Sequence, residues 1–375
     1  MSEPRLVRNP LVAKDTVRPL VDGSRDFHRS MPGYRPTPLA ALPAAAARLG
    51  AGSVHAKDES ARMGMPSFKI LGASWATYRT LLAHLGHPAD SGLGLTELKT
   101  ELAAKAPGLR LVSATDGNHG RAVARMAALL GLSAHILVPE DMVQERIDAI
   151  AGEGARVEVV PGGYDDAIRR SAELADTDSL VVSDTSWEGY VDPPSWVIDG
   201  YSTMIGEILD EIAAGGIPRP TVVVAQIGVG AFGAAVARGF RESAGTRLLG
   251  VEPLDADCVT ASIEAGGITT IPGPQRSIMA GLNCGTPSVI AWPDVSGGYD
   301  IFATVTDAAA EDAMRLMYAD GVVSGESGAA GLAGLLTHAG ELGLGPDDHI
   351  LIFSTEGATD LANFNRVTGA ALAGA

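Results

Sequence analysis

The sequence predicts an α/β protein of two domains, each built on a mostly parallel sheet flanked by helices. Short apolar runs rich in β-branched residues alternate with alanine-rich segments of helical spacing along most of the 375 residues. This alternation is typical of a parallel sheet with helices on both faces. The strand-like runs are continuously apolar, as expected for buried parallel strands. The length also suits two domains of about 150 residues or more each.

The alternation of expected strands and helices begins near residue 53 and is interrupted twice. Residues 87–98 and 189–201 are rich in turn-forming residues and mark the expected crossings between domains. We therefore predict a large domain of residues 1–88 and 203–375, with a small domain of residues 89–202 inserted in it. The expected strands and helices are residues 53–60, 69–85, 109–116, 119–132, 134–141, 143–155, 156–162, 164–176, 179–184, 221–227, 231–243, 247–253 and 349–355.

Composition excludes several classes of function. The 45 acidic and 28 basic residues give a net charge of -17, which repels nucleic acids and anionic membrane surfaces. Cys258 and Cys284 belong to no metal-binding pattern and are expected to be buried. His84 and His87 have no acidic or cysteine partner nearby in sequence, so no metal site is expected. The N-terminal region lacks the apolar core of a secretory signal, which favours a cytoplasmic protein.

A glycine-rich stretch, "QIGVGAFGAAVARGF", follows an expected strand at residues 226–240. Gly228, Gly230 and Gly233 have the spacing of a dinucleotide-binding turn, and Glu252 follows nineteen residues after Gly233. The same turn would hold any phosphate, because the backbone N–H groups at a helix N-terminus attract anions. This stretch therefore leaves two ligands open, a dinucleotide and a single phosphate.

Lys69 opens an apolar helix in "PSFKILGAS". Its neighbours are Phe68, Ile70 and Leu71, so the ammonium group is expected to be poorly solvated. Burial lowers the pKa of a lysine and makes its amine suitable for Schiff-base chemistry. The alternative is a lysine whose stem packs on the helix while its ammonium reaches water.

A second polar junction, "SATDGNHGRAVA", lies between an expected strand and an alanine-rich helix. Thr115, Asp116, Asn118 and His119 gather there around glycines, and such a turn can bind a carboxylate through successive N–H groups. Asp116 is placed for proton transfer. The alternative is that these residues only cap the helix.

The order of these motifs resembles the pyridoxal-phosphate enzymes of fold type II, the tryptophan synthase β-like fold. The resemblance covers nearly the whole chain and is carried by "YRPTPL", "PSFKILGA", "TDGNHG", "GVGAF" and "STEG". More narrowly, "KDESARMGMPSFKILGASWA", "ATDGNHGRAVA", "SDTSWEGY", "MAGLNCGTPS" and "STEGATD" resemble the diaminopropionate ammonia-lyases. The implied fold is the two-domain architecture of that family, with the large domain binding the cofactor.

The resemblance implies a role for each matching residue. Lys69, next to Phe68, would bind pyridoxal 5'-phosphate covalently, and Asn118 would contact its phenolic oxygen. The substrate carboxylate would be bound by the loop of Thr115, Asp116, Gly117 and His119. The phosphate would be held by Gly228, Val229, Gly230, Ala231 and Phe232, and the pyridine nitrogen would face Ser354 and Thr355. On this interpretation the glycine turn binds one phosphate, and Glu252 has no ribose to hold.

The implied reaction is the α,β-elimination of 2,3-diaminopropionate, through aminoacrylate, to pyruvate and two molecules of ammonia. Lys69 would remove the Cα proton of the L-isomer, and Asp116 that of the D-isomer from the opposite face. Asp116 or Asp184, the latter in "SDTSW", would protonate the departing amine, unless Asp184 only caps a turn. The family resemblance also implies a homodimer that acts on a small amino acid.

Three alternatives stay open at this stage. The first is a pyridoxal-phosphate-dependent dehydratase of serine, threonine or hydroxyaspartate, or a β-replacement enzyme acting on a related amino acid. The second is an NAD-dependent oxidoreductase built on the glycine turn and Glu252, which leaves "PSFKILGA" and "TDGNHG" unexplained. The third is a non-catalytic relative, against which the presence of Lys69, Asp116 and Asp184 argues.

Overall fold

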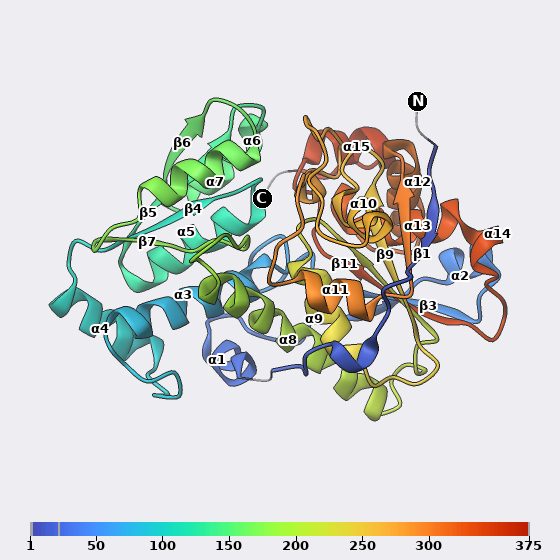
Figure 1. Cartoon of the computed structure of the whole chain (residues 1–375), viewed down its shortest axis with the longest axis horizontal. Helices are drawn as coiled ribbons and strands as arrows, with labels where there is room; N and C mark the ends of the chain where they lie inside the picture. Colours follow the sequence, from blue (N-terminus) through green and yellow to red (C-terminus); the bar gives the residue numbers. More distant parts are fainter. Residues whose placement is uncertain (1–2, 22, 374–375) are drawn as a thin grey trace. The chain divides into compact units, whose positions relative to one another are not determined.

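The computed structural model describes residues 3–21 and 23–373, and its chain divides into two compact units (Figure 1). Unit 1 comprises Met1–Asp22, Arg35–Phe68 and Tyr201–Ala375, and unit 2 comprises Gly23–Tyr34 and Lys69–Gly200. Each unit has its own sheet flanked by helices, which confirms the predicted fold class. Within the described residues, the longest apolar helices fall short of what crossing a membrane requires.

Unit 1 is built on a seven-stranded sheet whose order is β1-β10-β9-β8-β11-β3-β2. The five inner strands are parallel, whereas β1 and β2 pair antiparallel at the two edges. The inner strands β8, β10 and β11 are largely apolar and buried, as expected for strands with both faces covered, whereas β3 contains several polar residues. The strands are β1 Leu6–Arg8, β2 Leu39–Ala41, β3 Ser53–Asp58, β8 Val222–Gln226, β9 Arg247–Pro253, β10 Ile301–Val305 and β11 His349–Ser354.

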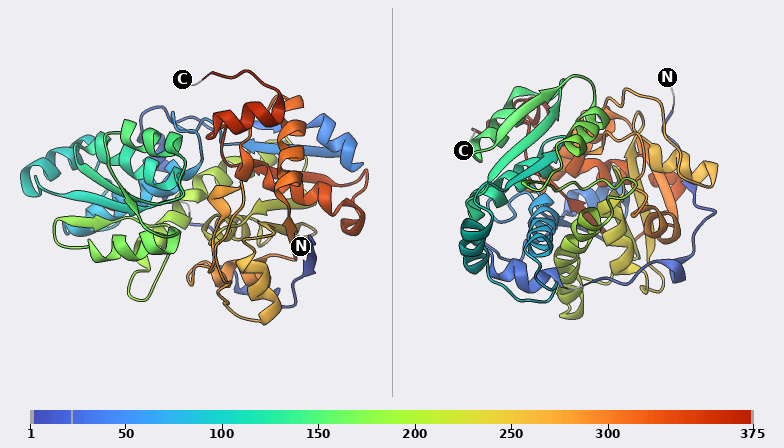
Figure 2. Two further views of the ribbon diagram at one scale, coloured as in Figure 1. Left: turned by 90° about the horizontal axis from the view of Figure 1, so that it is seen from above. Right: turned by 60° about the vertical axis from the view of Figure 1, so that its left-hand side comes forward.

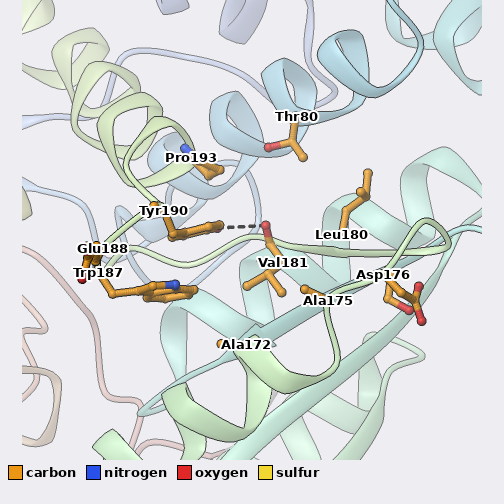
Figure 3. Close-up of a pocket in the computed structure, with 12 residues that line it drawn as sticks. Thr80, Ala172, Ala175, Asp176, Leu180, Val181, Trp187, Glu188, Tyr190 and Pro193 are labelled. Carbon is orange, nitrogen blue, oxygen red and sulfur yellow. Dashed lines mark hydrogen bonds between the residues drawn. The ribbon is translucent and has the colours of Figure 1, made fainter.

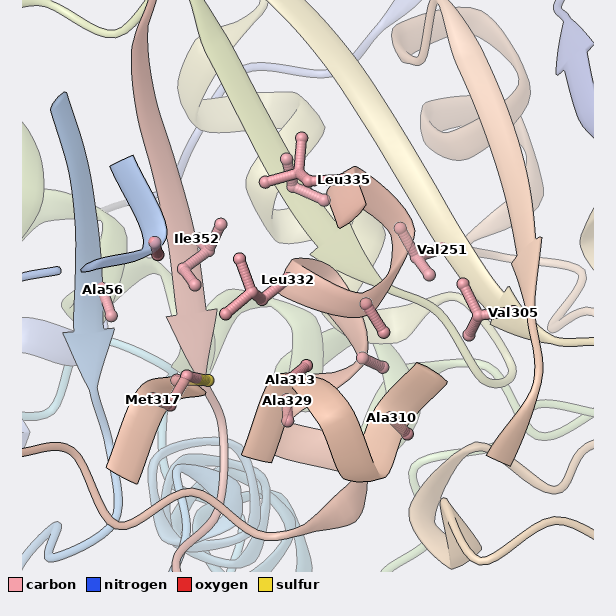
Figure 4. Packing of buried hydrophobic residues seen from close by; sticks show 14 of the residues in the cluster. Ala56, Val251, Val305, Ala310, Ala313, Met317, Ala329, Leu332, Leu335 and Ile352 are labelled. Carbon is pink, nitrogen blue, oxygen red and sulfur yellow. The ribbon is translucent and has the colours of Figure 1, made fainter. Parts of the chain in front are cut away.

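The core of unit 1 lies between this sheet and two alanine-rich helices, α12 (Asp307–Ala319) and α13 (Glu326–Thr337). Figure 4 shows Leu332 of α13 directed toward Ile352 of the sheet, and Leu335 belongs to the same cluster. The small side chains let α13 pack closely on the sheet: a Cβ at Gly334 would come within 2.5 Å of Val251 in β9, and one at Gly331 would lie 3.6 Å from Val224 in β8. The other helical segments are η1 Lys14–Thr16, α2 Pro43–Leu49, α9 Ala231–Phe240, α10 Cys258–Ala265, η2 Ala280–Leu282, α11 Trp292–Gly298, α14 Ala339–Leu342 and α15 Leu361–Thr368.

Unit 2 is built on a four-stranded, fully parallel sheet of order β6-β5-β4-β7. Its strands and their connecting helices, drawn from cyan to green, lie together in both views of Figure 2. The strands are β4 Arg110–Ala114, β5 Ser133–Pro139, β6 Arg156–Val160 and β7 Ser179–Val181. The helices are α1 Ser24–Ser30, α3 Lys69–His84, α4 Leu95–Lys105, α5 Asn118–Leu130, α6 Gln144–Gly152 and α7 Tyr164–Glu173.

The structure differs from the sequence-based expectation at residues 189–201. The expectation that this stretch is built of turns was wrong for most of it, because helix α8 spans Asp192–Ala213, whereas the boundary between the two units does fall within it, between Gly200 and Tyr201. Its two prolines, Pro193 and Pro194, occupy the first turn, where a missing N–H costs no helical hydrogen bond. Residues 23–34 and 69–88 group with unit 2, because α1 and α3 pack there, α3 against α5.

Candidate active site

In unit 2, two candidate loops follow neighbouring strands. Residues 115–117 follow β4, and residues 182–185 follow β7. The chain runs from β4 to β5 on one side and returns to β7 on the other, so the strand order reverses between β4 and β7. Ligands of open parallel sheets bind at such a reversal, beyond the carboxyl ends of the strands. The fold therefore brings the loops that carry Asp116 and Asp184 to the same edge of the sheet.

Lys69, the first residue of α3, forms an ion pair with Asp184. Its Nζ lies 2.7 Å from Asp184 Oδ2, and the two side chains are 17% and 6% exposed. The other carboxylate oxygen, Oδ1, accepts a hydrogen bond of 3.2 Å from the Tyr164 hydroxyl. Burial alone would raise the pKa of Asp184, but the Lys69 ammonium, His119 and the Tyr164 hydroxyl outweigh it and hold the pKa well below its usual range. Asp184 is therefore a carboxylate that faces the amine of Lys69.

The loop after β4 is held by the hydroxyl of Thr115. This oxygen accepts hydrogen bonds of 2.9 Å from the backbone N–H groups of Gly117 and Gly120. Gly117 has φ +140°, a conformation that favours glycine, and a Cβ at Gly120 would come within 2.4 Å of Thr115. The Thr115 side chain thus has the capping role considered from the sequence, while Asp116 and Asn118 are half-buried beside it.

His119 points into unit 2 and toward Asp184. Its ring is 1% exposed, and Nε2 lies 3.0 Å from the backbone oxygen of Val182. Its other nitrogen, Nδ1, lies 3.9 Å from Asp184 Oδ2. This placement makes contact with Asp184 the more direct role, whereas substrate binding by His119 stays a prediction. Sequence reasoning missed Tyr164, because nothing near "GGYDDA" indicates that this helix start reaches the loop after β7.

The stretch after Asp184 is fixed by Tyr190. Its hydroxyl accepts a hydrogen bond of 2.9 Å from Ser183 N and donates one of 2.8 Å to Val181 O. The ring stacks on Trp187 with centroids 4.0 Å apart, and both rings line a pocket of about 380 Å³ between α7, β7 and the start of α8 (Figure 3). Tyr190 therefore holds the backbone on either side of Val182, next to Asp184.

In unit 1, the glycine turn connects β8 to the N-terminus of α9. A Cβ at Gly228 would lie 3.2 Å from both Cys284 Sγ and the backbone oxygen of Gly281, and Gly230 has φ +104°. The first turn of the ten-residue helix α9 follows directly, and its N–H groups have no acceptor within the helix. A glycine-rich turn at the start of a helix suits a phosphate.

Three further predicted residues, Phe68, Ser354 and Thr355, lie in unit 1 close to this turn. Thr355 is tied to the strand before the turn, because Gln226, the last residue of β8, donates a hydrogen bond of 2.8 Å to Thr355 Oγ1, and β8 and β11 are neighbouring strands. Ser354 is buried, and its hydroxyl donates a hydrogen bond of 2.9 Å to Ser324. Phe68 N donates to Thr355 O over 3.1 Å, and the Phe68 ring lies 5.0 Å from that of Phe232. The strand order thus gathers Phe68, the turn and the Ser354–Thr355 pair.

Glu252 has a different role from the one that a dinucleotide requires. It is fully buried, and its carboxylate accepts hydrogen bonds from Val259 N, Thr260 N and Thr260 Oγ1 at the start of α10, at 2.8, 2.6 and 2.6 Å. Burial raises the pKa of Glu252 to about 8. A carboxyl group whose oxygens already accept hydrogen bonds at the start of a helix is not available to a ribose, so the structure gives the dinucleotide alternative no support.

Comparisons with known proteins agree on one family. Residues 31–356 match the family described as pyridoxal-phosphate dependent enzyme. The chain is 36% identical over 362 residues to a diaminopropionate ammonia-lyase of Escherichia coli strain K12, covering 92% of this chain and 90% of that protein. It is 37% identical over 356 residues to the diaminopropionate ammonia-lyase of Salmonella typhimurium, covering 89% and 88%. The crystal structure of the Escherichia coli enzyme in complex with D-serine superposes with a TM-score of 0.89 at 33% identity, covering 98% of this chain and 97% of that one.

Proposed function

The chain belongs to the diaminopropionate ammonia-lyases, within the pyridoxal-phosphate-dependent enzymes, and from that premise we propose that it eliminates both amino groups of 2,3-diaminopropionate as ammonia, leaving pyruvate. The observation that carries the proposal is the Lys69–Asp184 ion pair of 2.7 Å. It places an amine and a carboxylate together at the edge of the unit 2 sheet where ligands of parallel sheets bind. Asp116 follows the neighbouring strand at that edge.

The residues of the chain suit pyridoxal phosphate, which supplies an electron sink for the carbanion that forms at Cα. We propose that Lys69 binds its aldehyde covalently, because a partly buried lysine amine is the group that such chemistry needs. The phosphate is assigned to the turn of Gly228–Phe232, where a Cβ at Gly228 would fill the space. Phe68, Asn118, Ser354 and Thr355 are assigned to the ring, as the family resemblance implies.

Proton transfer is divided among three residues. Lys69 can act as a base only after its ammonium has lost a proton, and the carboxylate of Asp184 lies 2.7 Å away to receive or return one. Lys69 is assigned the Cα proton of the L-isomer, and Asp116 that of the D-isomer. When the bond between Cβ and nitrogen breaks, its electron pair goes to nitrogen, and Asp184 is assigned the protonation of that amine. The released aminoacrylate reacts with water to give pyruvate and the second ammonia.

A direct assay tests the function. The purified protein is examined for the visible absorbance of a lysine-bound cofactor, and L- and then D-2,3-diaminopropionate are added with pyruvate detection. Pyruvate from either isomer supports the proposal. If the absorbance is present but no pyruvate forms, 2,3-diaminopropionate is not the substrate. That result favours the alternative of a pyridoxal-phosphate-dependent dehydratase or β-replacement enzyme. A β-hydroxyl substrate has no need of two carboxylates beside the leaving group, which is why the diamino acid is preferred.

Asp116→Asn is expected to cripple turnover of the D-isomer by about 10²-fold or more, because an amide cannot accept the Cα proton. Turnover of the L-isomer should change much less, since Lys69 serves that face. The measurement is kcat/KM for each isomer under identical conditions. Equal losses on both isomers would refute the assignment of one base to each face.

Gly230→Ala is expected to weaken cofactor binding and to destabilise the protein by about 1–2 kcal/mol, because φ +104° is strained for alanine. Gly245→Ala is a matched control, with φ +81° and open space around its Cβ position. Urea unfolding and titration of the apoprotein with pyridoxal phosphate measure the two effects. Both variants should lose stability, but only Gly230→Ala should lose cofactor affinity. Unchanged affinity in Gly230→Ala contradicts a phosphate site in this turn.

A homodimer and a cytoplasmic location complete the proposal. The homodimer rests on the family resemblance, and sedimentation velocity of the purified protein tests it. The location is carried over from the sequence-based expectation. The net charge of -17 disfavours nucleic acid and anionic membranes as partners. Fractionation of cells that express the protein tests the location.

A further inference from the structure

His119 has one ring nitrogen that is satisfied and one that is not. Nε2 lies 3.0 Å from the backbone oxygen of Val182, and because a carbonyl oxygen can only accept, Nε2 carries a hydrogen. Nδ1 is buried and, among the residues that the structure describes, has no hydrogen-bond partner. Its ion-pair neighbour is Asp184, whose Oδ2 is 3.9 Å away. The unsatisfied nitrogen therefore faces the carboxylate that the reaction uses.

The fixed hydrogen on Nε2 limits what Nδ1 can do. If the ring is neutral, Nδ1 presents a lone pair to a carboxylate, and neither group can donate a hydrogen bond. If one more proton is present, it lies either on Nδ1 or on Asp184, and the two groups can then form a charge-assisted hydrogen bond. The pair of His119 and Asp184 is therefore built to share one proton.

The other titratable groups around Asp184 come from three elements. Lys69 at the start of α3 contacts Oδ2, and Tyr164 at the start of α7 contacts Oδ1. Burial raises the pKa of the third group, Tyr190, and the nearby charge of Asp184 adds to that rise. Of these, only Lys69 is a cation, and its amine has another task in the reaction. Once Lys69 no longer carries its positive charge, the Nδ1 nitrogen of His119, 3.9 Å away, is the other basic group beside Asp184 among the described residues.

We propose that His119 stores the proton that Asp184 gives to the departing amine. This inference rests on the proposed function. In the step, the bond between Cβ and nitrogen breaks and its electron pair stays on nitrogen. The one shared proton moves from Nδ1 of His119 to Asp184 and from Asp184 to that nitrogen, and solvent returns a proton to Nδ1 later in the cycle. His119 touches Asp184 and is thus a positioning residue that acts through it.

Histidine NMR of the apoprotein tests the shared proton without substrate or cofactor. Of the eight histidines, the His119 signal is identified by its loss in His119→Gln. In Lys69→Ala, which removes the competing cation, Nδ1 of His119 should carry a proton at pH 7. In the double variant Lys69→Ala/Asp184→Asn that proton should be lost. A bare Nδ1 in Lys69→Ala, or the same state in both variants, overturns the proposal whatever the substrate is.

The leaving group provides a second test. His119→Gln keeps a donor for the Val182 oxygen but offers no group to Asp184. It should lower kcat for 2,3-diaminopropionate by about 10²-fold, with little change in KM or in cofactor absorbance. With β-chloroalanine, whose chloride leaves without a proton, the loss should be several-fold smaller. His135→Gln removes another buried histidine of unit 2 as a control and should leave both rates unchanged. Equal losses on the two substrates in His119→Gln indicate a structural role and overturn the proposal.

Discussion

Lys69→Ala is expected to lower turnover of 2,3-diaminopropionate by about 10⁴-fold or more and to abolish the absorbance of the lysine-bound cofactor, because the variant loses both the covalent attachment and the base for the L-isomer. The variant also leaves Asp184, 5% exposed, without its ammonium partner. Its pKa should rise toward the usual range, because burial then acts with less opposition. Absorbance spectra measure the loss of the lysine-bound cofactor, and single-turnover pyruvate release measures the loss of turnover.

Lys69→Arg separates the two roles of Lys69. A guanidinium keeps a positive charge beside Asp184, but it stays protonated and forms no covalent bond with an aldehyde. The variant should therefore unfold at nearly the same denaturant concentration as the wild type and still be inactive. If Lys69→Arg retained a tenth or more of the wild-type kcat, Lys69 would serve only as a charge partner, and the assignment of the cofactor lysine would fail.

Features that depend on one local segment could be predicted from the sequence. The strand at 222–226, its glycine turn and helix α9 follow from an apolar run, a G-x-G spacing and an alanine-rich segment. Lys69 stood out because apolar residues surround it at a helix start. The N-terminus of α8 was missed because Pro193 and Pro194 read as turn residues, although the first helical turn tolerates both.

Features that depend on tertiary structure could not be predicted. β10, "IFATV", is as apolar as many helical segments, and only pairing with β1 and β9 fixes it as a strand. Tyr164 and His119 meet Asp184 only because β7 pairs with β4. From the sequence, His119 was expected to cap a helix or bind substrate and Tyr164 was not singled out, whereas both lie against Asp184, which is 65 and 20 positions away in the chain. The short distances from Tyr164 and His119 to Asp184 depend on the order of the strands in the sheet, which cannot be determined from a single sequence.

A buried charge network in unit 1 supports the segment that leads to Lys69. Arg62 bonds to Glu59 at 2.6 Å and to Glu207 of α8 at 2.8 Å, and Lys57 bonds to Glu207 at 2.7 Å. The Thr37 hydroxyl also joins the network, because it donates a hydrogen bond to the Glu59 carboxylate and accepts one from the Arg62 guanidinium. Two cations and two anions are thus almost fully buried with balanced charge. Losing one anion leaves a cation unpaired, which costs more than the pair contributes.

Glu207→Gln is therefore expected to lower the free energy of unfolding at pH 7 by about 3–5 kcal/mol. The matched control is Glu211→Gln, at an exposed position of the same helix. Its free energy of unfolding should stay within about 0.5 kcal/mol of wild type. Burial would raise the pKa of Glu207, but Arg62 and Lys57 outweigh it and lower the pKa to about 2. A carboxyl with a depressed pKa in the folded state contributes stability above its unfolded value of about 4.3. That contribution disappears as the pH falls from about 4.3 toward 2. The wild type should therefore lose stability between these pH values, whereas Glu207→Gln should not show the loss that comes from protonating Glu207. Urea unfolding across the window measures both curves, and parallel acid limbs would show that the network does not hold Glu207 ionised.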